Sequence, residues 1–173
     1  MKSLLQTLNG TNISPPPIWL MRQAGRHLPE YLKIRSQADS FLDFCYSPDM
    51  AVEATLQPVL RYGMDAAILF SDILVIPDAL GQRVSFIPGH GPRLEPLDGR
   101  ADINHLDPSN LHAHLAPVYA AIRRIRTRLP ETTTLIGFAG APWTVATYMI
   151  EGGGSRDCQK TRTFAYEAKE DFQ

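Results

Sequence analysis

Cysteine is scarce in this sequence: Cys45 and Cys158 are the only two among 173 residues, and they lie far apart. This argues against a disulfide framework or a cysteine zinc site, and we interpret both as reduced thiols of a cytoplasmic protein. The five histidines are not spaced as metal ligands either. His112 and His114, for example, are two positions apart on an expected helix and face different sides. We therefore expect no metal.

Long apolar runs are also missing, since no stretch approaches the roughly 20 residues that a membrane-spanning helix needs. Residues 1–12 lack the basic region and apolar stretch of a signal peptide. Neither sign of charge is in excess, because 17 Lys and Arg face 18 Asp and Glu, for a net charge of -1. This balance argues against a nucleic-acid or membrane-surface partner, so an anionic ligand would need a local basic cluster.

What the sequence does contain is an alternation of short apolar runs and amphipathic segments. Strands that are apolar at every position are buried on both faces, which is typical of parallel sheets. The chain is therefore predicted to be α/β, as an open sheet or as part of a barrel. We expect strands at 18–21, 66–70 and 134–138, helices at 48–63, 107–129, 143–150 and from 162 onward, and an inserted β-hairpin of 84–87 and 93–95.

The helix over 48–63 has the clearest boundaries. Ser47 can cap its free N–H groups, Pro48 suits the first turn, and Gly63 suits the left-handed position that closes a helix. The helix over 107–129 is predicted from apolar residues that recur every three or four positions.

In parallel α/β folds, ligands bind beyond the carboxyl ends of the strands. The predicted strands place three segments there, namely 21–26, 71–72 and 139–142. Asp72 directly follows an apolar strand, so its carboxylate is expected at the floor of a pocket, or else in a helix cap or an ion pair. Tyr148, on the following helix, has the pattern of a core aromatic residue with a polar hydroxyl.

Residues 22–35 form a basic stretch next to a predicted strand end. Besides Glu30, its charged side chains are Arg22, Arg26, Lys33 and Arg35. An arginine presents a planar fork of donors that matches a carboxylate or a phosphate. Arg22 and Arg26 are therefore candidates for an anion clamp, and the alternative is a solvated basic loop.

Three long motifs resemble the signature of the uroporphyrinogen decarboxylase family. They are residues 17–31 (PIWLMRQAGRHLPEY), 67–74 (AILFSDIL) and 137–144 (GFAGAPWT), the last followed by 147–152 (TYMIEG). The similarity runs in order from Ser14 to Arg162. It departs from the family pattern at His27, where tyrosine is frequent.

The resemblance implies the N-terminal part of a (β/α)8 TIM barrel, with residues 1–173 forming a portion of a single barrel domain whose C-terminal half is absent. It implies a homodimer when full length, acting on the tetrapyrrole uroporphyrinogen III without a metal or an organic cofactor. The implied reaction removes carbon dioxide from the four acetate side chains to give coproporphyrinogen III, a step of heme biosynthesis.

The resemblance also implies roles for residues of the motifs. Asp72 would lie under the macrocycle and accept hydrogen bonds from pyrrole N–H groups, and Tyr148 would lie beside the reacting arm. Together with Arg22 they are the expected catalytic residues, and Arg35 is expected to assist binding. The residues expected to bind substrate are Arg22, Gln23, Ala24, Gly25, Arg26, Asp72 and Tyr148.

Two alternatives stay open at this point. A related corrinoid or thiol methyltransferase of the same superfamily would share the barrel, although such relatives generally lack the arginine motif at 22–26. A truncated, non-catalytic product would keep the binding residues without a closed barrel. Because the sequence stops inside an expected helix, we expect a fragment that is inactive alone.

Overall fold

The computed structural model describes residues 1–21, 25–87 and 91–172. The chain folds into two compact units. The first unit comprises Met1–Asp72 and Ala116–Phe138, and the second comprises Ile73–Leu115 and Ala139–Gln173. Each unit buries apolar side chains of its own.

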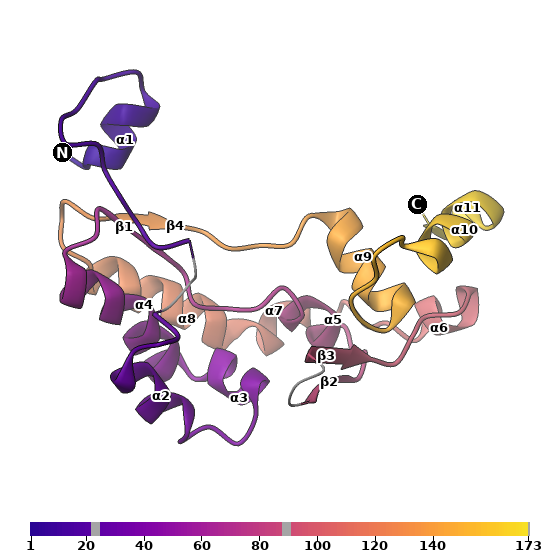
Figure 1. The fold of residues 1–173 in the computed structure, drawn as a ribbon. Coiled ribbons are helices and arrows are strands. Elements are labelled where there is room, and N and C mark those ends of the chain that lie inside the picture. The colour runs from indigo at the N-terminus through magenta and orange to yellow at the C-terminus, as the bar shows by residue number, and fades with distance from the viewer. Residues whose placement is uncertain (22–24, 88–90, 173) are drawn as a thin grey trace. The chain divides into compact units, whose positions relative to one another are not determined.

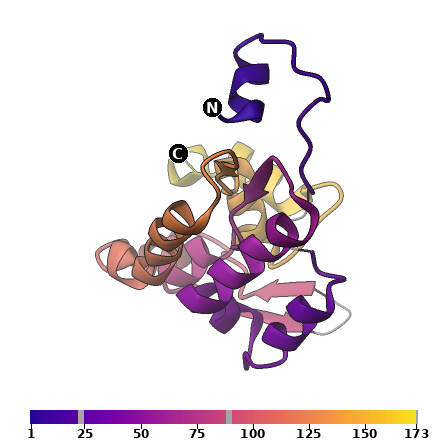
Figure 2. The same cartoon turned by 90° about the vertical axis from the view of Figure 1, so that its left-hand side faces the viewer.

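The first unit combines helices with a pair of parallel strands. Its helices are α1 (Ser3–Leu8), α2 (Pro29–Arg35), α3 (Phe41–Tyr46), α4 (Pro48–Tyr62) and α8 (Ala116–Arg128), and its strands are β1 (Ala66–Ile68) and β4 (Thr134–Ile136). Ala66 pairs with Thr134 and Ile68 with Ile136, while α4 packs along α8 (Figures 1 and 2). The predicted α/β arrangement with parallel strands is thus confirmed.

The boundaries of α4 follow from its sequence as predicted. The Ser47 hydroxyl accepts a hydrogen bond from the Met50 N–H at 3.4 Å, and Pro48 occupies the first turn. Gly63 closes the helix in the left-handed region at φ 65°, and its N–H donates to the Val59 carbonyl at 2.8 Å. Val52, fully buried, lies on the face that packs into the unit.

The strand expected at 18–21 is wrong, because the described residues 18–21 adopt no strand. The Ile18 N–H donates to the Asp65 carboxylate at 2.9 Å, and the Ile18 carbonyl accepts from the Asp65 N–H at 2.9 Å. A side chain therefore takes the N–H that a strand ladder would use. Ile18 remains 59% exposed and Met21 85% exposed, so this apolar run is not buried as the prediction assumed.

The second unit packs short helices against a two-stranded hairpin. Its helices are α5 (Val75–Ala79), α6 (Arg100–Asn104), α7 (Leu111–His114), α9 (Pro142–Glu151), α10 (Gln159–Glu167) and α11 (Lys169–Phe172). The strands β2 (Val84–Ile87) and β3 (Gly91–Leu94) run antiparallel, with Val84 opposite Leu94, which confirms the predicted hairpin. Leu74, Leu94 and Met149 form its buried core.

The helix expected over 107–129 is shorter and interrupted. The Asp107 carboxylate accepts the Ser109 N–H at 2.8 Å in a local turn, and helix begins only at Leu111. The chain leaves the helix at Leu115 and resumes as α8 at Ala116. Pro117 accounts for the break, because it has no N–H to donate to the preceding turn. The apolar periodicity of the sequence does not reveal that this backbone N–H is missing.

Gly152 ends α9 where no other residue fits well. Its φ is +76°, and a Cβ built there would lie 2.7 Å from the Pro96 Cγ and 3.0 Å from the Leu94 carbonyl oxygen. That close approach allows the Leu94 N–H to donate to the Gly152 carbonyl at 3.0 Å, which ties β3 to the end of α9.

We expect Gly152→Ala to lower the free energy of unfolding by about 1–3 kcal/mol, because it adds backbone strain and a steric clash. Urea denaturation followed by circular dichroism measures the change. Gly154→Ala is the matched control: its nearest neighbouring atom would be 3.9 Å away, and we expect a change within about 0.5 kcal/mol. Equal losses for the two variants would contradict the assigned role of Gly152.

Candidate functional site

Four aromatic side chains form a packed cluster in the first unit, here called the aromatic cluster: Tyr31, Phe41, Phe44 and Phe70. The ring centroids of Phe44 and Phe70 are 4.6 Å apart, and Phe70 lies 6.0 Å from both Tyr31 and Phe41. Phe44 and Phe70 are almost fully buried. The cluster therefore joins α2 and α3 to the chain that leaves β1.

Two arginines lie against this cluster. The guanidinium carbon of Arg26 is 5.9 Å from the Phe41 centroid, and that of Arg35 is 5.8 Å from Phe41 and 5.9 Å from Phe44. Arg35 also donates from Nη1 to the Ala38 carbonyl at 3.1 Å. The guanidinium groups are thus held on aromatic rings, where the negative face of each ring attracts them.

Asp72 is positioned by the buried chain that follows β1. The Phe70 N–H donates to the Thr55 hydroxyl at 2.9 Å, and this hydroxyl donates to the Ala51 carbonyl at 2.8 Å. The bond fixes the backbone two residues before Asp72 against α4. Ser71 between them is buried, and Asp72 is half-buried.

The three charged groups all influence the pKa of one buried thiol, Cys45. Burial, and then the Asp72 carboxylate, raise the pKa of Cys45 from 9.0 to about 12, while Arg26 and Arg35 act in the opposite direction. Asp72, Arg26 and Arg35 are therefore all close enough to Cys45 to change its pKa. Burial likewise raises the pKa of Tyr31, against the influence of the same two arginines.

The structure brings together only some of the predicted site residues. Gly25 is buried, and a Cβ there would lie 2.5 Å from the Leu28 Cδ1, so a larger residue would displace Leu28. Arg22, Gln23 and Ala24 lie outside the described residues. Tyr148 belongs to the second unit, where it packs against the core of Leu74, Leu94 and Met149. Its presence in the same site as Asp72 stays a prediction.

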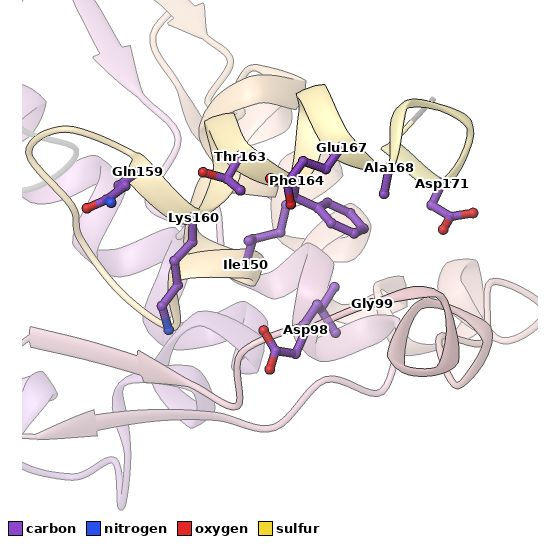
Figure 3. Close-up of a pocket in the computed structure, with 11 residues that line it drawn as sticks. Asp98, Gly99, Ile150, Gln159, Lys160, Thr163, Phe164, Glu167, Ala168 and Asp171 are labelled. Carbon is purple, nitrogen blue, oxygen red and sulfur yellow. The ribbon is translucent and has the colours of Figure 1, made fainter.

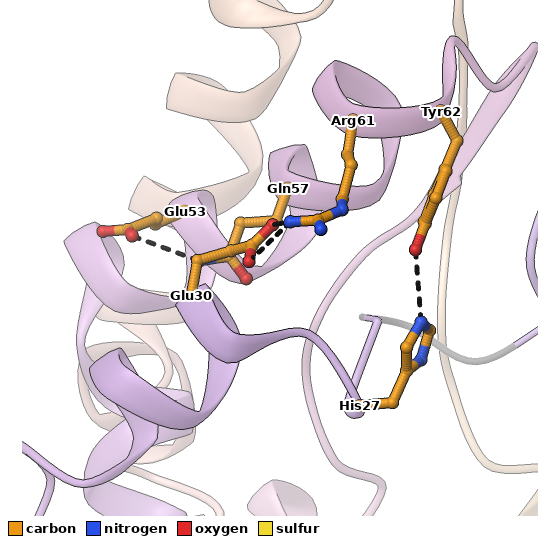
Figure 4. A network of polar contacts seen from close by, with 6 residues as sticks. All are labelled: His27, Glu30, Glu53, Gln57, Arg61 and Tyr62. Atoms are coloured by element: carbon orange, nitrogen blue, oxygen red, sulfur yellow. Dashed lines mark hydrogen bonds and ion pairs between the residues drawn. The ribbon is translucent and has the colours of Figure 1, made fainter.

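Glu30, the acidic residue of the segment 25–35, pairs with Arg61 of α4. Both Glu30 carboxylate oxygens accept from Arg61 Nη1, at 2.8 and 3.0 Å, and beside this pair His27 Nε2 lies 3.3 Å from the Tyr62 hydroxyl (Figure 4). A hydrogen bond from its own backbone, followed by that from Arg61, lowers the pKa of Glu30. Glu30 is thus engaged by α4 and kept ionised there.

A cavity in the second unit was not predicted from the sequence. It measures about 600 Å³, and its apolar wall is formed by Leu97, Ile150 and Phe164 (Figure 3). Asp98 and Lys160 are among the charged residues at its edge. Residues 97–99 and α10 line this cavity together although they are far apart in the sequence, so no local pattern indicates it.

The described ranges contain neither a group of potential metal ligands nor a candidate membrane-spanning helix. In residues 1–21, 25–87 and 91–172, no three His, Cys, Asp or Glu side chains are grouped as metal ligands. None of the helices in this part of the chain is long and apolar enough to cross a membrane.

The parallel β/α arrangement, with arginines and a carboxylate near the end of β1, defines the chain as an α/β protein with a candidate anion site. The family model of uroporphyrinogen decarboxylase (URO-D) matches residues 1–173, and the chain belongs to this family. It is 56% identical over 171 residues to a uroporphyrinogen decarboxylase of Rhodospirillum rubrum and 58% identical over 172 residues to one of Sinorhizobium fredii. These alignments cover 99% of the chain but 49% and 50% of the relatives, so the chain spans about half their length.

A solved structure also resembles the fold. A methyltransferase from Methanosarcina mazei superposes on 98% of this chain and 49% of its own, with a TM-score of 0.71 and 18% sequence identity. At that identity the similarity concerns the fold alone.

We expect the two cysteines to differ sharply in reactivity at pH 8, because only the thiolate is nucleophilic. Cys45 is 1% exposed with its pKa raised to about 12, whereas Cys158 is half-buried. Iodoacetamide should label Cys158 and leave Cys45 unmodified, as read by mass spectrometry of tryptic peptides. The urea-unfolded chain, in which both should react, is the control. Labelling of Cys45 as fast as Cys158 in the folded chain would contradict this geometry.

The same pKa shift predicts a pH dependence of stability. Since the folded-state pKa of Cys45 lies above its ordinary value of 9.0, its stabilising contribution is complete below pH 9 and is lost as pH rises toward 12. Urea midpoints compared at pH 8 and pH 10.5 should therefore fall more for the wild-type chain than for Cys45→Ala. Parallel declines in the two proteins would exclude this contribution.

Proposed function

We propose that this chain is the substrate-binding N-terminal part of a uroporphyrinogen decarboxylase. The observation that carries the proposal is the placement of Arg26 and Arg35 on one aromatic cluster, with the Asp72 carboxylate close to the same buried thiol. The sequence identity to relatives of that name supports the same substrate and reaction. The substrate would be uroporphyrinogen III, and the product coproporphyrinogen III.

The arginines would bind the carboxylates of the substrate. A guanidinium donates two parallel hydrogen bonds to a carboxylate and stays charged at any working pH. Arg26 and Arg35 would each hold one such group. By their motif positions, the residues proposed to join them in binding are Arg22, Gln23, Ala24 and Gly25.

Asp72 would act on the macrocycle itself. When a pyrrole is protonated on carbon, the bond to the acetate carboxylate can break, because its electron pair enters the cationic ring as carbon dioxide leaves. A proton then completes the methyl group, and the ring carbon gives up the proton it had accepted, which restores the neutral pyrrole. The Asp72 carboxylate would accept hydrogen bonds from pyrrole N–H groups and stabilise the positive charge where it develops. Tyr148 would hydrogen-bond beside the reacting arm. The ring serves as its own electron sink, so the proposed mechanism uses no metal or organic cofactor.

The whole protein is proposed to be a cytoplasmic homodimer with a closed (β/α)8 barrel. The described parallel strands β1 and β4, with the helices that accompany them, would form part of its wall, and residues 1–173 would be a portion of one barrel domain. The alternative of a corrinoid or thiol methyltransferase is supported by the fold similarity alone. The arginines at 22 and 26 favour the decarboxylase.

We expect the isolated chain to have no decarboxylase activity. Its two described parallel strands cannot close a barrel, so water would reach Asp72 and weaken its electrostatic effect. The purified chain, with its mass confirmed, should be incubated with uroporphyrinogen III under reducing conditions and the products separated by chromatography. Coproporphyrinogen III formed at ordinary enzymatic rates would overturn this expectation.

A hybrid that joins residues 1–173 to the C-terminal half of the Rhodospirillum rubrum relative should be active, and it tests the proposed function directly. In this hybrid, Asp72→Asn should lower kcat by about 100- to 1,000-fold while KM changes little, because it removes the charge and keeps the shape. Asp49→Asn is the matched control, since Asp49 is an exposed partner of Arg124. A folded but inactive hybrid, or near-normal turnover by Asp72→Asn, would contradict the proposal.

A further inference from the structure

One ring of the aromatic cluster contacts both arginines. Phe41 lies 5.9 Å from the Arg26 guanidinium carbon and 5.8 Å from that of Arg35, whereas Phe44 has such a contact with Arg35. Phe41 is half-buried and was not singled out by the sequence motifs. It is therefore the structural link between two cations that come from different parts of the segment 25–45.

Two guanidinium groups that contact one ring repel each other. A ring face carries negative partial charge and attracts a cation within about 6 Å. By contacting both groups, Phe41 offsets part of their repulsion without neutralising either charge. A carboxylate in the same place would cancel the charge that an anionic ligand needs.

Phe41 is itself held in place. It is the first residue of α3, and the Ser40 hydroxyl caps this helix by accepting from the Asp43 N–H at 3.0 Å. Its ring packs edge-on against the buried Phe70, with 6.0 Å between centroids and an interplanar angle of 77°. Phe70 in turn is fixed by its backbone bond to Thr55. The ring is thus anchored to the same segment that carries Asp72.

We propose that Phe41 is a positioning residue, whose ring holds Arg26 and Arg35 side by side so that they bind two carboxylates of one polycarboxylate ligand. The identity of that ligand as a porphyrinogen rests on the proposed function above. Phe41 touches the arginines and acts on the ligand through them. If the ring only filled space, its loss would change stability and leave the arginines as they were.

The first test is binding by the chain itself, with the fluorescent polycarboxylate uroporphyrin as the probe. We expect Phe41→Leu to weaken binding by about tenfold, because the ring is lost and a similar volume is kept. Phe41→Tyr keeps the ring face and should bind within about twofold of wild type. Phe164→Leu, at a half-buried ring that packs on Phe172 in the second unit, is the matched control and should bind normally.

The second test observes the arginines without a ligand. In NMR spectra, the Phe41 ring current should displace the Nε–Hε signals of Arg26 and Arg35. Phe41→Leu should abolish this displacement for Arg26 and reduce it for Arg35, which also lies over Phe44, while Phe41→Tyr preserves it. Phe41→Met replaces the leucine variant if circular dichroism shows that the latter is unfolded.

The two tests distinguish the positioning role of Phe41 from the identity of the ligand. Unchanged arginine signals in Phe41→Leu would overturn the positioning role, as would normal uroporphyrin binding by Phe41→Leu when Arg26→Ala and Arg35→Ala bind weakly. If the wild-type chain binds no uroporphyrin, the arginine signals alone decide the role of Phe41, and the activity of the hybrid decides the proposed substrate.

Discussion

The buried hydroxyl of Thr55 links the helix α4 to the chain that leaves β1, and the candidate site depends on this link. It donates to the Ala51 carbonyl and accepts the Phe70 N–H, so its hydrogen-bonding capacity is used inside the unit. Phe70 contacts Tyr31, Phe41 and Phe44. One backbone bond therefore sets the position of the aromatic cluster, and two residues later that of Asp72. A displaced Phe70 would move the rings on which the arginines lie.

The charge of the site depends on its titratable neighbours. Cys45 and Tyr31 stay neutral, and Glu30 is paired with Arg61. Burial keeps the Cys45 thiol and the Tyr31 hydroxyl protonated, since it raises the pKa of each. Glu30 is ionised but engaged by Arg61 on α4. Among the described residues, Asp72, Arg26 and Arg35 are charged groups that act on Cys45, which suits a ligand bearing carboxylates on a ring that becomes cationic.

Local sequence patterns predicted those parts of the fold that depend on local chemistry. The caps of α4, the antiparallel hairpin and the buried apolar run of β1 all have short-range causes, and the structure contains them. The strand at 18–21 was wrong because the Asp65 side chain takes the Ile18 N–H, a contact that joins distant positions. The helix expected over 107–129 is present as α7 and α8, and it is shorter and interrupted because the apolar periodicity takes no account of the N–H that Pro117 lacks.

For the site, sequence motifs indicated Arg26, Arg35 and Asp72 but missed Phe41. Its role comes from ring contacts with two arginines, and these contacts depend on how α2 and α3 pack. The spacing of Phe41 and Phe44, which puts them on one helical face, was the available signal. The cavity beside α10 had no such signal, because its wall joins residues 97–99 to a helix far along the chain.

We propose that the arginines on the aromatic cluster, with Asp72, form the ligand site of this chain. Backbone amide NMR shifts measured during titration with uroporphyrin test it most directly. We expect the perturbed signals to belong to residues 25–45 and 69–72 and to saturate together. Perturbations confined to the cavity of the second unit, at residues such as Asp98, Lys160 and Phe164, would contradict it.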